Sequence, residues 1–190
     1  MNEKTTMAQQ LSQVLAQLQL EQHDYTAIEK WQPKLCGEMD LVIRDNGDWE
    51  YQGSKITRQA MINLFAKVLW REDEQYFLKT PVEKLKIQVQ DVPLFIYNIE
   101  QVQIDGISYL QCHSTTGDVV TISEQHPIFM QKYQGQWRPY VHIRFGLNAL
   151  ILRSAFFQLI DYGELQEDSQ DNTILSLQSG DLMLKLMTPN

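Results

Sequence analysis

Hydrophobic and polar positions alternate with two different periods in the first half of the chain. Over residues 84–90 the alternation is strict: Leu85, Ile87 and Val89 point one way, and lysine and glutamine point the other way. This period of two is typical of a strand with one buried and one exposed face. Over residues 57–68 apolar side chains recur every three or four positions, which predicts an amphipathic helix. The two patterns together indicate an α+β fold.

Turn signals that contain glycine separate most of the other apolar segments. Asn46-Gly47 and Asp105-Gly106 are the strongest, because two-residue hairpin turns need positive φ angles that these residue types adopt readily. Thr116-Gly117 and Gln134-Gly135 predict two further turns, and a closing hairpin is expected around residues 179–181. Turns this frequent indicate short antiparallel strands.

Two helical segments resemble each other along the chain. Residues 58–65 and 153–160 have like residue types at nearly every position, and each segment follows a Gly-x-Trp hairpin, at residues 47–49 and 135–137. The pattern predicts a duplicated hairpin-plus-helix unit. The competing explanation is a chance similarity between two amphipathic helices.

The N-terminal residues predict one more helix. Leu11, Val14, Leu15 and Leu18 share a helical spacing, with glutamine between them. We expect this amphipathic helix to pack either on its own domain or on a partner. It is the main reason to consider a homodimer or a protein partner.

Composition places the chain among ordinary globular proteins. It has 190 residues, of which 43% are hydrophobic and 21% charged, enough for one domain or two small ones. The net charge is −8, and residues 161–184 hold six acidic residues and no basic one. Nucleic-acid binding needs a basic face, so this balance argues against a nucleic-acid partner.

The expected location is the cytoplasm. Cys36 and Cys112 are the two cysteines, too few for a disulfide framework. The first residues lack the apolar segment of a signal peptide. No window approaches the roughly 18 apolar residues that a membrane span needs, so no membrane association is expected.

Cysteine and histidine residues do not form a recognisable metal or catalytic pattern. Cys112 and His113 are neighbours on a predicted strand, so their side chains point to opposite faces and can hardly share a metal. A nucleophilic pair of Cys112 with His126 needs proximity, and a thiol in an apolar strand is more often inert. We therefore expect no metal and no cofactor.

Motifs of known chemistry are likewise missing from the sequence. The chain contains no GxSxG, GxGxxG or GxxxxGK[ST]. We expect no catalytic residues, although enzyme activity is left open. A hydrolase that uses Glu83, Asp91 or His126 as acid or base is the least favoured alternative.

Polar residues at predicted strand ends suggest a binding site. Arginine offers a planar fork of donors that suits carboxylate or phosphate. One hypothesis is a pocket for a small anionic ligand between two units of the chain. Its residues are Arg44, Lys84, Tyr140 and Arg144. The alternative is that the arginines pair with protein carboxylates and hold the units together, because structural ion pairs are commoner than sites. The candidate carboxylates are Asp45, Glu83 and Asp91.

Five segments, taken together and in order, resemble a known bacterial family. They are CGEMDLVIRDNGDWEYQGSKI, TPVEKLKIQVQDVP, EQHPI, PYVHIRFGL and FFQLIDYG. This set is similar to the domain-of-unknown-function family DUF1285 over about residues 36–163. The resemblance implies an α/β roll followed by a mainly β roll built from a related motif. It implies no established reaction, and ligand binding in bacterial signalling is the usual suggestion.

The resemblance and the patterns together give the expected organisation. Residues 1–35 form an N-terminal amphipathic helical segment, residues 36–93 the α/β roll, and residues 94–190 the mainly β roll with one helix and a C-terminal hairpin. The expected function is non-enzymatic small-ligand binding or sensing. A protein–protein interaction or assembly module is the alternative.

Overall fold

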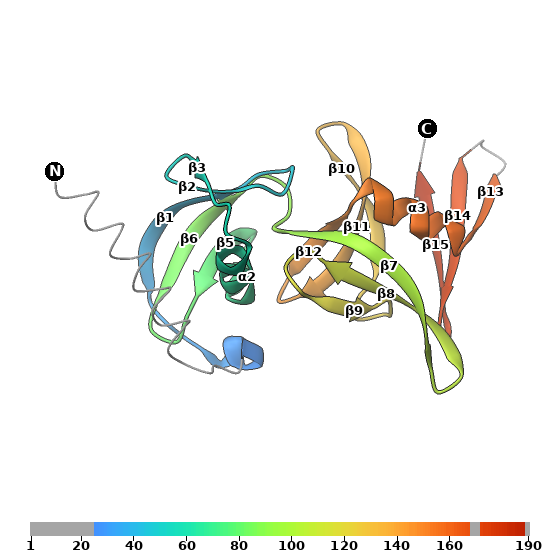
Figure 1. The fold of residues 1–190 in the computed structure, drawn as a ribbon, viewed down its shortest axis with the longest axis horizontal. Coiled ribbons are helices and arrows are strands. Elements are labelled where there is room, and N and C mark those ends of the chain that lie inside the picture. The colour runs from blue at the N-terminus through green and yellow to red at the C-terminus, as the bar shows by residue number, and fades with distance from the viewer. Residues whose placement is uncertain (1–24, 168–171, 189–190) are drawn as a thin grey trace. The chain divides into compact units, whose positions relative to one another are not determined.

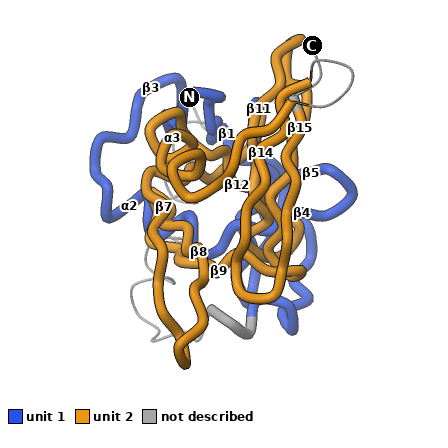
Figure 2. Tube along the Cα trace, turned by 90° about the vertical axis from the view of Figure 1, so that its right-hand side faces the viewer, with its two compact units in different colours: residues 1–90 blue, residues 91–190 orange. Residues whose placement is uncertain are grey.

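The computed structural model describes residues 25–167 and 172–188 (Figure 1). The chain divides into two compact units, Met1–Gln90 and Asp91–Asn190 (Figure 2). The expected helix over residues 6–20 lies outside the described residues.

Unit 1 is built on a curled six-stranded sheet with the order β3-β2-β1-β6-β5-β4. Its strands are β1 (Leu35–Ile43), β2 (Trp49–Tyr51), β3 (Ser54–Lys55), β4 (Leu69–Glu72), β5 (Gln75–Lys79) and β6 (Lys84–Val89). The central pair, β1 and β6, is parallel, and the other pairs are antiparallel. The 3-10 helix η1 (Tyr25–Lys30) precedes β1, and helix α2 (Gln59–Lys67) joins β3 to β4.

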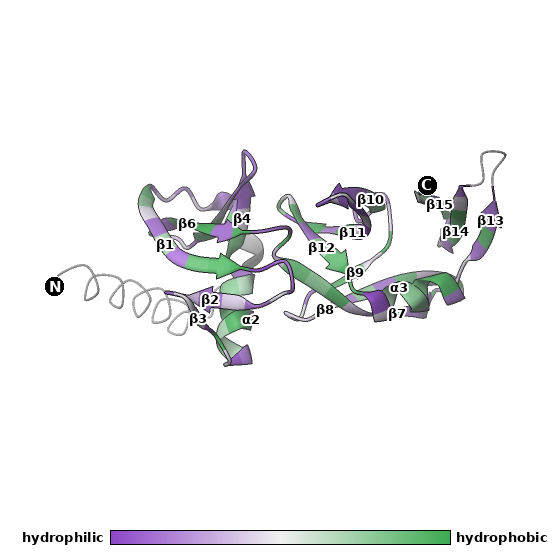
Figure 3. Ribbon diagram, turned by 90° about the horizontal axis from the view of Figure 1, so that it is seen from above, coloured by the Kyte–Doolittle hydropathy of each residue, from purple (hydrophilic) through white to green (hydrophobic). Residues whose placement is uncertain are grey.

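Hydrophobic periodicity explains the core of this unit. In β6, Leu85 and Ile87 are buried, as their alternation with lysine predicts. Helix α2 buries Phe65, and its hydrophobic residues are visible in Figure 3. Trp49 stacks on Phe65 with 6.4 Å between the ring centroids. The return strand of the Asn46-Gly47 hairpin is thereby anchored to the helix.

Unit 2 contains a second six-stranded sheet, with the order β10-β11-β12-β7-β8-β9. Its strands are β7 (Leu94–Ile104), β8 (Ile107–Ser114), β9 (Val119–Thr121), β10 (Ile128–Tyr133), β11 (Gln136–Arg144) and β12 (Leu147–Ile151). Helix α3 (Arg153–Asp161) follows, and a three-stranded sheet ends the unit with β13 (Glu164–Glu167), β14 (Thr173–Ser179) and β15 (Leu182–Thr188). The expected closing hairpin is thus present.

The two large sheets share one strand order. Numbered from its own first strand, each sheet runs 3-2-1-6-5-4, with its first and sixth strands paired in parallel. The β1–β2 turn at Asn46-Gly47 therefore corresponds to the β7–β8 turn at Asp105-Gly106, and not to Gln134-Gly135 as the repeated Gly-x-Trp sequence suggests. The duplicated element is the sheet.

The helices are not equivalent parts of that repeat. Helix α2 lies between the third and fourth strands of its sheet, whereas α3 follows the sixth strand. Ala60 of α2 is exposed, while Ala155, its counterpart in the sequence similarity, is fully buried. The predicted hairpin-plus-helix repeat is therefore wrong in its register, because two amphipathic helices look alike wherever they occur in a fold.

The chain as a whole is mostly strand with two α-helices in its described residues, in keeping with the α+β class. None of the helices within residues 25–167 and 172–188 has the length and apolar character needed to cross a membrane.

Candidate functional site

The outer face of β4, β5 and β6 carries an unusual group of side chains. Residues directly opposite each other in an antiparallel pair lie on the same face of the sheet. Trp70 is paired with Phe77, and Lys79 is paired with Lys84. Since successive residues alternate between faces, this set points away from the face that holds buried Leu78.

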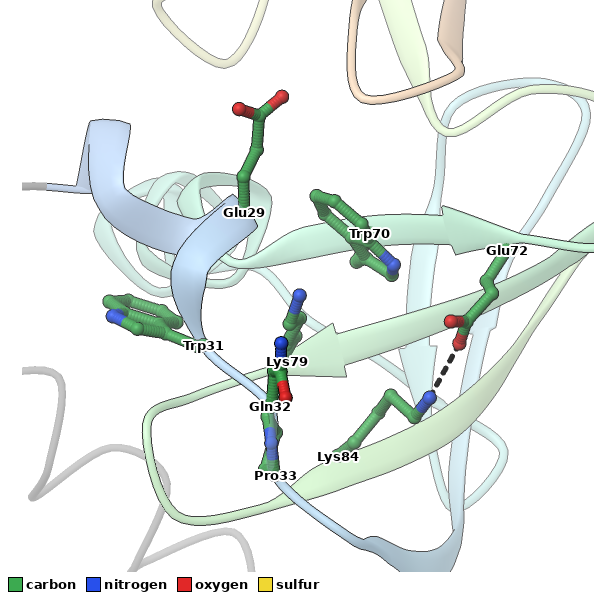
Figure 4. Close-up of a pocket in the computed structure, with 8 residues that line it drawn as sticks. All are labelled: Glu29, Trp31, Gln32, Pro33, Trp70, Glu72, Lys79 and Lys84. Atoms are coloured by element: carbon green, nitrogen blue, oxygen red, sulfur yellow. Dashed lines mark hydrogen bonds and ion pairs between the residues drawn. The ribbon is translucent and has the colours of Figure 1, made fainter.

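A pocket covers this face of the sheet (Figure 4). Its volume is about 370 Å³, within the range of small-molecule sites. The lining residues come from η1, from the segment that follows it, and from β4, β5 and β6. They are Glu29, Trp31, Gln32, Pro33, Trp70, Glu72, Lys79 and Lys84. The pocket thus combines two ammonium groups, two carboxylates and two indole rings.

Lys79 is the buried charge of the pocket. Only 6% of the residue is exposed, and its ammonium nitrogen lies 3.7 Å from the centroid of the Trp70 ring. Such a contact stabilises the cation through the negative face of the ring. None of the ion pairs among the described residues includes Lys79. Burial lowers the pKa of Lys79, against the opposing attraction of Glu72.

Lys84 lies across the strand pair from Lys79 and is paired with Glu72. The ion pair is drawn in Figure 4, and the Lys84 ammonium also lies 4.9 Å from the Phe77 ring centroid. The Lys84 side chain is 19% exposed and that of Glu72 is 49% exposed. An ion pair with one partner so accessible to water contributes little to stability. Glu72 can therefore leave Lys84 at a small cost in free energy when another anion takes its place beside Lys84.

Of the four residues predicted to form an anion pocket, Lys84 alone lines this one. The other three have acidic partners inside their own units. Arg44 Nε donates to Glu50 at 2.9 Å, Tyr140 Oη donates to Asp91 at 2.8 Å, and Arg144 Nε donates to Asp118 at 2.9 Å. Asp91 is also bonded by Arg138, at 3.1 Å. A pocket that joins all four residues stays a prediction.

Cys112, His113 and His126 lie in separate surroundings and do not form one site. Cys112 is fully buried, and burial raises the pKa of its thiol to about 12, so the thiol is neutral at ordinary pH. His113 bonds Glu100 at 2.9 Å, and a ring nitrogen of His126 lies 3.1 Å from the carbonyl oxygen of His142. In the part of the chain that the structure describes, no three His, Cys, Asp or Glu residues are grouped as a metal site requires.

A smaller cavity of about 260 Å³ occurs in unit 2. Its charged lining residues, Glu124 and Asp181, are both exposed. Ser179, also in the lining, has its hydroxyl committed, since it accepts from Leu110 N and donates to Ile122 O. No charged side chain of this cavity is buried, so the unit 1 pocket is the stronger candidate for a charged ligand.

Reasoning from the sequence missed Lys79, Trp70 and Trp31. A usable signal was present: Lys79 and Lys84 flank the short turn around Pro81, and a hairpin there places them opposite each other. No sequence pattern predicts that residues 31–33 line the pocket, because the tertiary fold alone brings them to β4 and β5.

The fold and the pocket define a mostly β protein of two units that share one strand order, with a ligand-sized, charged pocket in the first unit. Its sequence matches the DUF1285 N-terminal domain over residues 26–92 and the DUF1285 C-terminal domain over residues 93–186. The chain therefore belongs to the DUF1285 family, a family of unknown function.

Two solved structures of this family are similar to the chain. A DUF1285 family protein from Silicibacter pomeroyi DSS-3 has 35% sequence identity and a TM-score of 0.78, with 92% of this chain and 94% of that chain covered. A DUF1285 family protein from Shewanella baltica OS155 has 28% identity and a TM-score of 0.52, with coverages of 65% and 91%. No curated protein matches the sequence.

Proposed function

We propose that this protein binds a small anionic ligand in the unit 1 pocket and acts as a non-enzymatic sensor, in bacterial signal transduction. The observation that carries the proposal is Lys79. The residue is only 6% exposed, it lines a cavity large enough for a ligand, and its ammonium makes no ion pair among the described residues. Glu72 and Glu29 attract this ammonium without pairing with it, so a ligand anion that contacts it directly is expected to stabilise it further.

The rest of the lining suits recognition. The indole rings of Trp31 and Trp70 offer apolar surface for the body of a ligand, and the Gln32 amide can both donate and accept. Lys84, the cross-strand partner of Lys79, supplies a second ammonium to the lining. These groups bind and orient a molecule. A sensing role also requires that the ligand-bound protein differ in stability or in partner contacts from the ligand-free protein.

Thermal unfolding with simple aromatic anions tests the proposal. Benzoate and phenyl phosphate are expected to raise Tm, and the cation benzylamine is not. At about 100 times Kd, a ligand adds about 2.7 kcal/mol, which for a chain of this size is roughly 5–10 °C. Lys79→Met removes the ammonium and keeps an apolar stem in the same place, so the variant is expected to fold but to lose the shift.

Lys132→Met provides the matched control. Lys132 also lies over a tryptophan ring, 5.3 Å from the centroid of Trp137, but it is exposed and belongs to unit 2. Its removal changes the net charge by the same amount and is expected to leave the anion shift intact. Equal shifts in the Lys79→Met variant and the wild type would contradict the proposal, and so would the absence of any shift with either anion.

A further inference from the structure

We infer that the charged group of the ligand is a dianion of the phosphate-monoester type, which bridges Lys79 and Lys84 and displaces Glu72 from Lys84. The inference rests on the proposed function, since it concerns the same pocket. It adds the charge class of the ligand and a residue that sets selectivity by competing with it.

The first argument is the register of β5 and β6. Lys79 and Lys84 are direct cross-strand partners, and both side chains line the cavity. Directly opposed residues have Cβ atoms about 5 Å apart, and like charges in this position destabilise a sheet. The repulsion is felt at Lys79, whose pKa Lys84 helps to lower. One group with two negative charges, placed between the ammonium groups, offsets the repulsion and pairs both.

The second argument is the charge balance among the side chains that line the pocket. Lys84 is ion-paired with Glu72, whereas Lys79 has the ring of Trp70 against its ammonium and is attracted by Glu72 and Glu29 without an ion pair to either. A monocarboxylate therefore completes the balance at Lys79 and leaves the Lys84–Glu72 pair in place. A dianion compensates both lysines and makes Glu72 superfluous.

Glu72 is well placed to leave. It is the last residue of β4, and its side chain is 49% exposed, so the freed carboxylate enters water without a large desolvation change. A phosphate monoester carries about −1.5 to −2 charges at pH 7 on three acceptor oxygens, which matches two lysine donors. The expected ligand is therefore a small phosphorylated molecule whose apolar or ring portion contacts the indoles.

Calorimetric titration of the full chain with phenyl phosphate and with benzoate tests this inference. The wild type is expected to bind phenyl phosphate about tenfold more tightly, a difference of about 1.4 kcal/mol. Lys84→Met is expected to remove this preference while benzoate binding changes less than about twofold. Glu72→Gln is expected to tighten phenyl phosphate binding several-fold, because the internal competitor is gone. In the double variant Glu72→Gln, Lys84→Met, the gain disappears, as coupling through Lys84 requires.

Glu74→Gln is the matched control for Glu72→Gln. Glu74 lies two residues further along the same hairpin, is exposed, and does not line the pocket. The substitution removes the same charge, so a general electrostatic effect would tighten binding in both variants. We expect a change of less than about twofold for Glu74→Gln, since exposed charges at a distance are screened.

The outcomes separate the two proposals. Equal affinities for benzoate and phenyl phosphate, both lost in Lys79→Met, would overturn the dianion inference and leave anion binding at Lys79 standing. A phosphate preference that survives Lys84→Met, or equal effects of Glu72→Gln and Glu74→Gln, would also overturn it. Failure of both probes to bind the wild type would remove the proposed function as well.

Discussion

At the scale of single residues, the two cysteines differ in the properties that decide thiol reactivity. Cys36 is exposed, whereas Cys112 is fully buried and the pKa of its thiol is raised to about 12. The thiolate is the reactive form, so Cys112 has little of it at pH 8. We expect one thiol per chain to react quickly with Ellman's reagent in the folded protein and two in guanidinium chloride. Two rapidly reacting thiols in the folded state would contradict the buried position of Cys112.

Glu83 makes the stability of the folded protein depend on pH in a direction that its burial determines. Burial raises the pKa of Glu83, and its Oε1 atom is buried without a hydrogen-bond partner within the described ranges. A carboxyl whose folded pKa is raised contributes stability below the unfolded pKa, and this contribution is lost as the pH rises through the folded pKa. Glu83→Gln keeps the shape and removes the charge. The variant is therefore expected to be more stable than the wild type at pH 7.

Urea unfolding at two pH values checks this expectation. The stability difference between Glu83→Gln and the wild type is expected to shrink towards pH 4, where Glu83 itself is protonated in the folded state. A difference that is constant between pH 4 and pH 7 would show that the carboxylate charge is not the cause.

At the scale of elements, the β4–β5 turn carries more backbone strain than the other two-residue turns of the described chain. Five two-residue turns in the described chain have both residues at positive φ. Four of them have glycine in the second position, but the β4–β5 turn has Glu74, at φ 63°. Side chains with a Cβ atom are disfavoured there by about 1–2 kcal/mol. The strain lies two residues from Glu72, at the edge of the candidate pocket.

We expect Glu74→Gly to stabilise the protein by up to about 1 kcal/mol, since relief of the strain exceeds the added freedom of the unfolded chain. The corresponding turn of unit 2, between its fourth and fifth strands, provides the control. There Gly135→Ala is expected to destabilise by about 1 kcal/mol, because a Cβ at φ 83° is strained although nothing lies within 4 Å of it. Urea midpoints measure both changes, and a destabilised Glu74→Gly variant would contradict the strain.

Local signals explain what could be predicted at this scale. The turns at residues 46–47, 105–106 and 134–135 and the alternation in β6 depend on neighbouring residues, so the sequence reveals them. The pairing of β1 with β6 joins segments more than forty residues apart, and no local pattern announces such a contact. The similar helices therefore suggest a repeat from the sequence, whereas the repeat in the structure is the order of the strands.

At the scale of the whole molecule, the candidate site also combines a residue that the sequence predicts with one that only the tertiary fold reveals. Lys84 is predicted to contact a ligand because it is a polar residue at a strand end, and it lines the pocket. Lys79 looks like the end of an apolar strand, and it becomes a buried cation only because η1 and residues 31–33 cover the sheet at that point. A single sequence does not reveal that a distant segment will cover the outer face of a sheet.

The parallel pairing of first and sixth strands also governs how the chain can be made. Synthesis delivers β1 early, but its partner β6 ends at Val89, and in unit 2 β7 must likewise wait for β12. Until the sixth strand leaves the ribosome, the first three strands and the hairpin of the fourth and fifth strands have no strand that joins them into one sheet. Each six-stranded sheet is therefore closed in one late step, and a nascent chain that ends before the sixth strand lacks one of the two central strands of its sheet.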